Sequence, residues 1–303
     1  MSTAIARRSR FFDLHAAQDV FVMPNPFDVG SAKLLAAIGF PALATTSAGF
    51  AWSLGHDDYG VTRDALVAHV AQIAESVDVP LNVDGERLFA DDLDGVAATV
   101  RLLHEAGAAG CSIEDWNQAT SSIDDLSLAT ERVAAAAAAA HADPDDRLLL
   151  TARCEHLLHG VDDLDATITR LCAYRDAGAD CVYAPGLATV AQIAAVVDAV
   201  GVPLNVLALP GGPTVAEIGA AGARRVSVGS SLASTAYGAL MAGARELFEQ
   251  GHEHVSGDPL TAADRRPPLN LLPSGRRAEL AVARAAEAGH DERVLVQPLV
   301  DGR

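Results

Sequence analysis

Three carboxylates mark the ends of two β-rich segments of the chain. Asp84 and Glu86 close the segment PLNVDGE, and Glu114 closes the segment GCSIE. Because strand side chains alternate faces with a period of two, Asn82, Asp84 and Glu86 are expected on one face of their strand. Uncompensated buried carboxylates are costly, so several converging acids normally hold a divalent cation or pair with arginine. The placement of these acids therefore predicts a metal site.

A candidate anion receptor lies in the segment LTARCE, residues 150–155. Alternation places Thr151, Arg153 and Glu155 on one face and Cys154 on the other, so Arg153 is expected to point inward with the acids. A guanidinium can grip a carboxylate through two parallel hydrogen bonds. Beside a carboxylate-bound cation, Arg153 would form a receptor for a 2-oxo acid or a related dianion.

Other polar residues also lie at or near the ends of predicted strands. Thr46 and Ser47 end the second β-rich segment, the loop GHDDYG (residues 55–60) comes shortly after, and Asn205 lies within the seventh segment. Polar groups at successive strand ends are expected to converge on one site.

Each of these residues also has a plainer interpretation. Arg153 and Glu155 could form a structural ion pair, Asp84 could cap the next helix, and Asp58 could be an ordinary turn residue. Three histidines, His56, His156 and His159, show no His-x-His or HExxH spacing of the kind that binds zinc. They are most simply solvated loop residues.

The elements that must position these residues alternate regularly. Short β-rich runs fall at residues 20–27, 42–50, 80–86, 110–116, 148–155, 181–186, 203–210 and 225–231. Segments with helical spacing of apolar residues fall at 31–39, 62–77, 92–107, 124–141, 161–178, 189–200, 214–222 and 232–250. Eight such units predict a (β/α)8 TIM barrel with its active site at the carboxyl ends of the strands. The alternative is a doubly wound open sheet, but PNPFD replaces a GxGxxG turn after the first strand.

Composition narrows the class of function. The 303 residues are 50% hydrophobic and include 22 basic and 40 acidic side chains, for a net charge of −18. That charge argues against nucleic acid or an anionic membrane as a partner and favours a small-molecule enzyme. No apolar run approaches the roughly 20 residues of a membrane span, and four scattered cysteines suggest reduced core residues, so a cytoplasmic protein is expected.

The barrel pattern covers residues 1–250 and breaks afterwards. Residues 251–303 are expected to form an extension that packs on the barrel or on a neighbouring subunit, with a disordered tail as the alternative.

Four segments together resemble the isocitrate lyase/phosphoenolpyruvate mutase superfamily. They are TTSAGFAWSLGHDDYG (45–60), PLNVDGE (80–86), AGAAGCSIED (106–115) and TARCE (151–155). The resemblance implies a barrel whose last helix is exchanged between subunits, in a homo-oligomer that is a dimer or a dimer of dimers.

The resemblance also implies a set of roles. Mg²⁺, or Mn²⁺ as an alternative, would be held by Asp58, Asp84, Glu86 and Glu114. Thr46, Ser47 and Ala48, with Arg153, would bind the carboxylate substrate. Their positions at strand ends add Asp58 and Asn205 to the expected substrate-binding residues, and Glu114 and Arg153 are also expected to act in catalysis. Members of the family cleave or form C–C or P–C bonds next to a 2-oxo acid through an enolate.

The chain departs from the family in the loop after the fourth strand. The lyases carry a cysteine there and the mutases a lysine, whereas residues 115–122 read DWNQATSS. The acid/base would then be Tyr59, His56 or a metal-bound water. At the sixth strand, Tyr183 replaces the Glu or His of many members.

Three functions remain open at this level. The first is a Mg²⁺-dependent lyase that cleaves a C–C bond in a small 2-oxo or 2-hydroxy dicarboxylate. The second is a P–C bond enzyme, related to phosphonomutases or phosphonopyruvate hydrolase, although the loop lacks lysine. The third is a barrel that binds a 2-oxo acid without turning it over.

Overall fold

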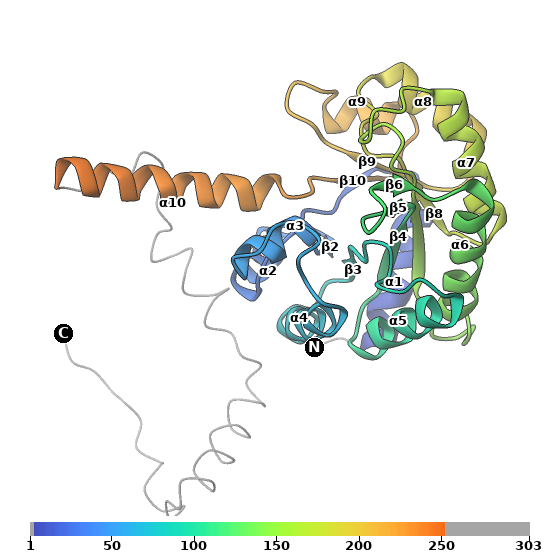
Figure 1. Ribbon diagram of the computed structural model, residues 1–303, viewed down its shortest axis with the longest axis horizontal. Helices are drawn as coiled ribbons and strands as arrows, with labels where there is room; N and C mark the ends of the chain where they lie inside the picture. The colour runs from blue at the N-terminus through green and yellow to red at the C-terminus, as the bar shows by residue number, and fades with distance from the viewer. Residues whose placement is uncertain (1–2, 252–303) are drawn as a thin grey trace, which may run out of the picture.

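The computed structural model describes residues 3–251, which fold around one eight-stranded parallel sheet (Figure 1). Neighbouring strands follow the order β1-β10-β9-β8-β7-β4-β3-β2. The strands are β1 (Phe21–Val22), β2 (Leu43–Ala44), β3 (Leu81–Val83), β4 (Gly110–Glu114), β7 (Leu149–Arg153), β8 (Cys181–Tyr183), β9 (Leu204–Leu207) and β10 (Arg225–Ser227). All eight predicted β-rich segments contain one of these strands.

The first and last strands of this order, β1 and β2, are joined by hydrogen bonds at and just beyond their carboxyl ends. The Ala44 N–H donates to the carbonyl of Pro24 at 3.1 Å, and Asn25 Nδ2 donates to the carbonyl of Thr45 at 2.8 Å. The prediction of a TIM-barrel-type fold is confirmed by this topology.

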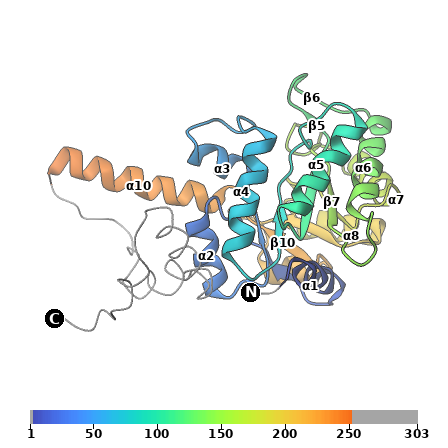
Figure 2. The same ribbon diagram turned by 90° about the horizontal axis from the view of Figure 1, so that it is seen from below.

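Helices surround the sheet in two views at right angles (Figures 1 and 2). The predicted helices appear as α2 (Val29–Ile38), α4 (Arg63–Ser76), α5 (Leu93–Glu105), α6 (Leu126–Ala140), α7 (Leu164–Asp176), α8 (Val190–Val200), α9 (Val215–Ala220) and α10 (Ser231–Gln250). Three of them end at a left-handed glycine, Gly39 with φ 106°, Gly201 with φ 68° and Gly251 with φ 72°, a conformation that costs glycine little.

An additional helix, α1 (Ala4–Ala16), covers the amino ends of the strands. Its buried residues Phe11 and His15 pack against Phe21 at the start of β1, with ring centroids 6.4 and 5.1 Å apart. The apolar cluster around Phe11 includes the first residues of β7 and β8, Leu149 and Cys181. The carboxyl ends of the strands are left to form the site.

The prediction of a strand over residues 42–50 is wrong in its second half. β2 ends at Ala44, and helix α3 (Ser47–Ser53) follows. The Thr46 hydroxyl caps this helix by accepting from the Gly49 N–H at 3.3 Å. A side chain at Gly49 would come within 2.6 Å of Thr46 Cγ2, so the close turn requires glycine.

A small hairpin interrupts the unit after β4. Its strands are β5 (Trp116–Asn117) and β6 (Ser122–Ile123), in a segment for which only a loop was expected.

Helix α10 runs away from the barrel in both views (Figures 1 and 2). Several of its apolar side chains are exposed, including Leu240 at 64% and Phe248 at 91%. The predicted extension over residues 251–303 lies outside the described residues apart from Gly251. Within residues 3–251, no helix is both long and apolar enough to cross a membrane.

Candidate active site

A central cavity of about 220 Å³ opens at the carboxyl ends of the strands. Most of the predicted substrate and metal residues line it: Thr46, Ser47, Ala48, Asp58, Asp84, Arg153 and Asn205. The start of α3, the 55–60 loop, the turn after β3, and strands β7 and β9 thus contribute to one concave surface.

Arg153 is surrounded by carboxylates. Its guanidinium makes two hydrogen bonds to Glu155, and NH1 lies 3.3 Å from Glu114 Oε2 and 3.6 Å from Asp84 Oδ1. The Tyr183 ring lies on another side, 5.4 Å from the guanidinium carbon. The ion pair with Glu155 exists, as the plainer interpretation allowed, yet Arg153 also faces the cavity and two of the predicted metal ligands.

The register of the parallel strands explains why Arg153 lies beside Glu114. Glu114 and Arg153 are paired positions of the neighbouring strands β4 and β7, and Arg153 is in turn paired with Tyr183 on β8. Paired residues of parallel strands share a face, so these three side chains converge.

The site holds more acidic than basic side chains, and burial together with this excess of negative charge raises the pKa values of several carboxyl groups. Burial, with the charges of Asp84 and Asp58, raises the pKa of Glu86 to about 8. Burial raises the pKa of Glu114, and Glu155 and Asp84 add to that rise against the opposing effect of Arg153. Burial, and secondarily Asp84, also raises the pKa of Asp58. Additional positive charge would relieve this repulsion.

The donor set fits a hard divalent cation. Carboxylate oxygens are the ligands that Mg²⁺ prefers, and Mg²⁺ commonly keeps several waters between itself and the protein. In the part of the chain that the structure describes, no three such side chains come close enough to grip an ion directly. The residues predicted to hold the cation are Asp58, Asp84, Glu86 and Glu114, and their carboxylate oxygens are of the kind that Mg²⁺ prefers.

Asp84 is held in place by the end of β2. Its Oδ2 accepts from the Ser47 N–H at 3.1 Å, and its own N–H donates to the Thr45 hydroxyl at 2.9 Å. It does not cap the following helix, because Asp92 caps α5.

Glu86 does not share the cavity face of Asn82 and Asp84 as predicted. β3 ends at Val83, and Glu86 adopts φ 48°, so the strand alternation stops before it. Glu86 instead lines a neighbouring cavity of about 210 Å³ together with Tyr59 and Trp116.

The two candidate acid/base residues differ in position. The Tyr59 hydroxyl donates to Glu114 Oε1 at 2.9 Å, and burial together with the Glu114 charge raises its pKa, so the hydroxyl stays protonated. His56 lies exposed on the 55–60 loop and is not part of the cavity wall. Of the two, only Tyr59 touches the acid cluster.

The other two histidines differ in exposure: His156 is buried, contrary to the prediction, whereas His159 is exposed, as predicted. His156 is buried, with Nδ1 3.3 Å from the Thr167 hydroxyl. His159 stacks on Trp116 with centroids 3.5 Å apart and approaches Glu155 at 3.8 Å.

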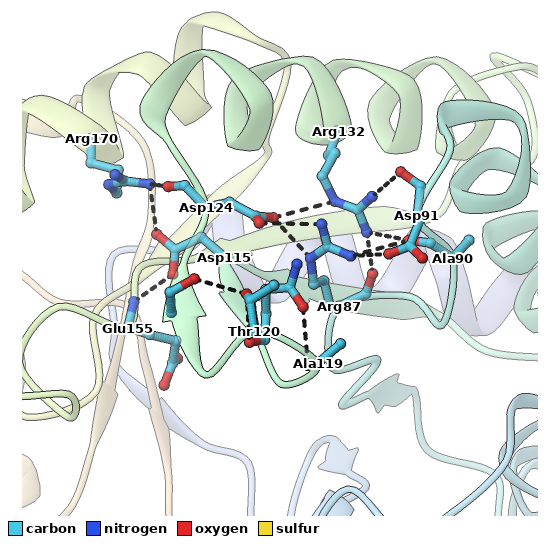
Figure 3. A network of polar contacts seen from close by, with 12 residues as sticks. Arg87, Ala90, Asp91, Asp115, Ala119, Thr120, Asp124, Arg132, Glu155 and Arg170 are labelled. Atoms are coloured by element: carbon cyan, nitrogen blue, oxygen red, sulfur yellow. Dashed lines mark hydrogen bonds and ion pairs between the residues drawn. The ribbon is translucent and has the colours of Figure 1, made fainter.

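A polar network behind the acids fixes both ends of the β5–β6 hairpin (Figure 3). At one end, Asp115 accepts from the Glu155 N–H at 2.8 Å and from Arg170 at 3.2 Å. At the other end, Asp124 accepts from Arg87 at 2.8 Å. The Asp124 N–H also donates to the Asp115 carbonyl at 2.8 Å, so a backbone hydrogen bond joins the two residues that flank the hairpin.

Sequence reasoning missed several residues of the cavity wall. They are Asn25, Ser112, Tyr183, Arg225 and Ser227, among others. Arg225 and Ser227 sit two apart on a buried strand, and a charged residue inside such a strand was the available signal.

Residues 11–248 match the sequence profile of the family described as phosphoenolpyruvate phosphomutase. The chain belongs to this family. A solved structure from Burkholderia cenocepacia J2315, provisionally described as a lyase/mutase, is 45% identical. The similarity covers 86% of this chain and 95% of that one, with a TM-score of 0.82.

Several relatives have named activities, of which two illustrate the range. The 2-methylisocitrate lyase of Escherichia coli K12 is 33% identical over 185 residues, 57% of this chain and 60% of the relative. The oxaloacetate decarboxylase of Paraburkholderia xenovorans LB400 is 32% identical over 211 residues, 67% and 69% of the two chains. The resemblance predicted from the four segments is thus confirmed, and the relatives named here act by breaking C–C bonds.

Proposed function

We propose that the protein is a Mg²⁺-dependent lyase that cleaves a C–C bond next to the oxo or hydroxy carbon of a small 2-oxo or 2-hydroxy dicarboxylate. The observation that carries this proposal is the position of Arg153, which faces the cavity between Asp84 and Glu114. A receptor for a carboxylate and a receptor for a cation then lie side by side.

The residues divide the work. Arg153, with the backbone and side chains of Thr46, Ser47 and Ala48, binds the substrate carboxylate. Asp58, Asp84, Glu86 and Glu114 hold the cation, which supplies Lewis-acid stabilisation of negative charge on the substrate oxygen. Arg153 adds a fixed positive charge that favours an enolate over the intact substrate.

The site offers few side chains that could transfer a proton to or from the substrate. Tyr59 is the candidate acid/base residue that contacts the acid cluster, because its hydroxyl donates to Glu114 at 2.9 Å, but its raised pKa makes it a weak proton donor. The base of the β5–β6 hairpin, Asp115 and Asp124, supports the segment where related lyases carry cysteine. Substrates that need only enolate stabilisation therefore suit this site best.

The four unpaired cysteines, Cys111, Cys154, Cys172 and Cys181, support a reducing, cytoplasmic location. The exposed apolar side chains of α10 support a homo-oligomer in which this helix packs on a neighbouring subunit.

Two measurements test the function together. Isothermal titration with Mg²⁺ and oxalate reports binding, and NMR of a panel of 2-oxo and 2-hydroxy dicarboxylates, with Mg²⁺ or with EDTA, reports release of pyruvate or oxalate. We expect binding and EDTA-sensitive cleavage of at least one dicarboxylate above the protein-free Mg²⁺ rate. Phosphonopyruvate as the preferred substrate would favour a P–C enzyme, and binding without turnover would favour a sensor.

A further inference from the structure

Arg225 lies inside the barrel with only neutral partners. It is the first residue of β10, is 2% exposed and lines the central cavity. Its Nε donates to Asn205 Oδ1 at 2.9 Å and its NH2 to the Thr151 hydroxyl at 2.9 Å. Its NH1 lies 3.1 Å from His15 Nε2. These contacts use three of the five N–H groups of a guanidinium.

His15 supplies no opposite charge. Its Nδ1 lies 2.8 Å from the Phe11 carbonyl, so this nitrogen donates and Nε2 accepts from Arg225. Burial, with the neighbouring charge of Arg225, lowers the pKa of His15 to about 3, which leaves the ring neutral at pH 7.

The contrast with Arg153 is sharp. Arg153 has three carboxylates within 4.0 Å, whereas no carboxylate among residues 3–251 lies within 4.0 Å of Arg225. A buried charge without a counter-charge is strongly disfavoured, and burial accordingly lowers the pKa of Arg225. An anion entering the cavity that Arg225 lines would remove this cost.

The cavity that Arg225 lines is also lined by neutral hydrogen-bond donors, including the side chains of Ser112, Tyr183 and Ser227. Such groups can donate to an anion without adding a charge.

We propose that Arg225 forms an anion subsite at the floor of the central cavity, which takes a carboxylate group or another small anion without help from the divalent cation. The subsite lies at the start of β10, whereas Asp58 and Asp84 lie beyond the carboxyl ends of their strands. A corollary, which rests on the proposed function, is a preference for substrates with a carboxylate at each end.

Metal-free protein isolates this subsite, because the uncompensated acids near Arg153 repel anions when no cation is bound. Formate and chloride are titrated into the wild type in EDTA, with binding followed by calorimetry and by the rise in melting temperature. We expect saturable binding, and Arg225→Met should weaken it about tenfold or more, the loss typical of a buried charge-assisted hydrogen bond.

Matched variants make the result specific. Arg224→Met removes the same charge one residue away, where Arg224 contacts Gln18 at 3.1 Å outside the cavity, and should leave formate binding unchanged. Arg225→Lys keeps the charge and should retain more affinity than Arg225→Met. If Arg225→Met does not fold, Arg225→Lys and the wild-type titration decide the question.

Two outcomes overturn the proposal. One is a wild-type protein that binds neither formate nor chloride in EDTA, and the other is an Arg225→Met protein that folds and binds them as the wild type does. Asp84→Ala separates this proposal from the proposed function, because it should abolish Mg²⁺-dependent turnover yet keep metal-free formate binding.

Discussion

Glu114 and Arg153 occupy paired positions on adjacent strands, and their side chains approach to 3.3 Å. The same guanidinium reaches Asp84 at 3.6 Å and binds Glu155, so one arginine faces three carboxylates. The remaining negative charge would favour the binding of a divalent metal ion.

Replacing Asp84 with alanine should abolish the activation of turnover by Mg²⁺ while the barrel still folds. The variant loses one oxygen ligand, and relief of repulsion among the remaining acids offsets part of the structural cost. Turnover is measured against Mg²⁺ concentration, with circular dichroism as the folding check. Asp57→Ala, in the exposed turn beside Asp58, serves as the control. An unchanged Mg²⁺ titration in Asp84→Ala would refute the metal assignment.

Arg153→Lys should lower the affinity for oxalate about tenfold or more. Lysine is a point charge and cannot reproduce the planar two-bond grip of a guanidinium. Calorimetry with Mg²⁺ present gives the affinity. Arg147→Lys is a matched control, because Arg147 pairs with Asp180 at 2.8 Å outside the cavity. A loss below roughly twofold for Arg153→Lys would mean that Arg153 serves Glu155 structurally.

The protein should cleave 2-methylisocitrate slowly or not at all, even with saturating Mg²⁺. The β5–β6 hairpin offers no cysteine, histidine or lysine between Trp116 and Ile123. An acid/base group typically contributes about 10² to 10⁴-fold in rate, so its absence is measurable against an authentic lyase assayed in parallel. Comparable turnover would show that another residue supplies the proton, and Tyr59→Phe and His56→Gln would then identify it.

Acid should destabilise the fold partly through His69. This ring stacks on Phe50 at 3.7 Å, its Nε2 is buried without a partner among the described residues, and burial lowers its pKa from 6.5 to about 4. Above pH 6.5 the ring is neutral in both the folded and unfolded states. As the pH falls from 6.5 to 4, the unfolded chain binds a proton that the folded state excludes, so stability is lost.

The His69 contribution amounts to about 3 kcal/mol across that range, at about 1.4 kcal/mol per pKa unit. His69→Phe keeps the stacked ring and removes the titration. Urea unfolding between pH 7.5 and 4 should therefore show a shallower loss of stability in this variant. Parallel curves for the two proteins would contradict the assignment.

The exposed face of α10 should mediate self-association. Phe248→Ser combined with Leu240→Ser removes two large apolar side chains, which are 91% and 64% exposed. Light scattering should give a multiple of 31.3 kDa for the wild type and a smaller assembly for the double variant. A wild-type mass of one chain would contradict the proposal.

The eight strands and their helices were predictable because period-two and helical patterns are local. Thr46 and Ser47 were placed at the right point of the chain but in the wrong element, because a helix cap depends on the Gly49 contact. Glu86 was misplaced because the strand pattern does not reveal that its backbone turns to positive φ. Arg225 was missed because its partners, Thr151 and His15, come from distant elements that only the closed barrel brings together.

A crystal structure of the protein with Mg²⁺ and oxalate tests the proposed cation and carboxylate sites together. We expect a cation among Asp58, Asp84, Glu86 and Glu114, with oxalate bound both to the cation and to the Arg153 guanidinium. Oxalate bound away from Arg153, or a cation that none of these acids contacts directly or through water, would contradict this expectation.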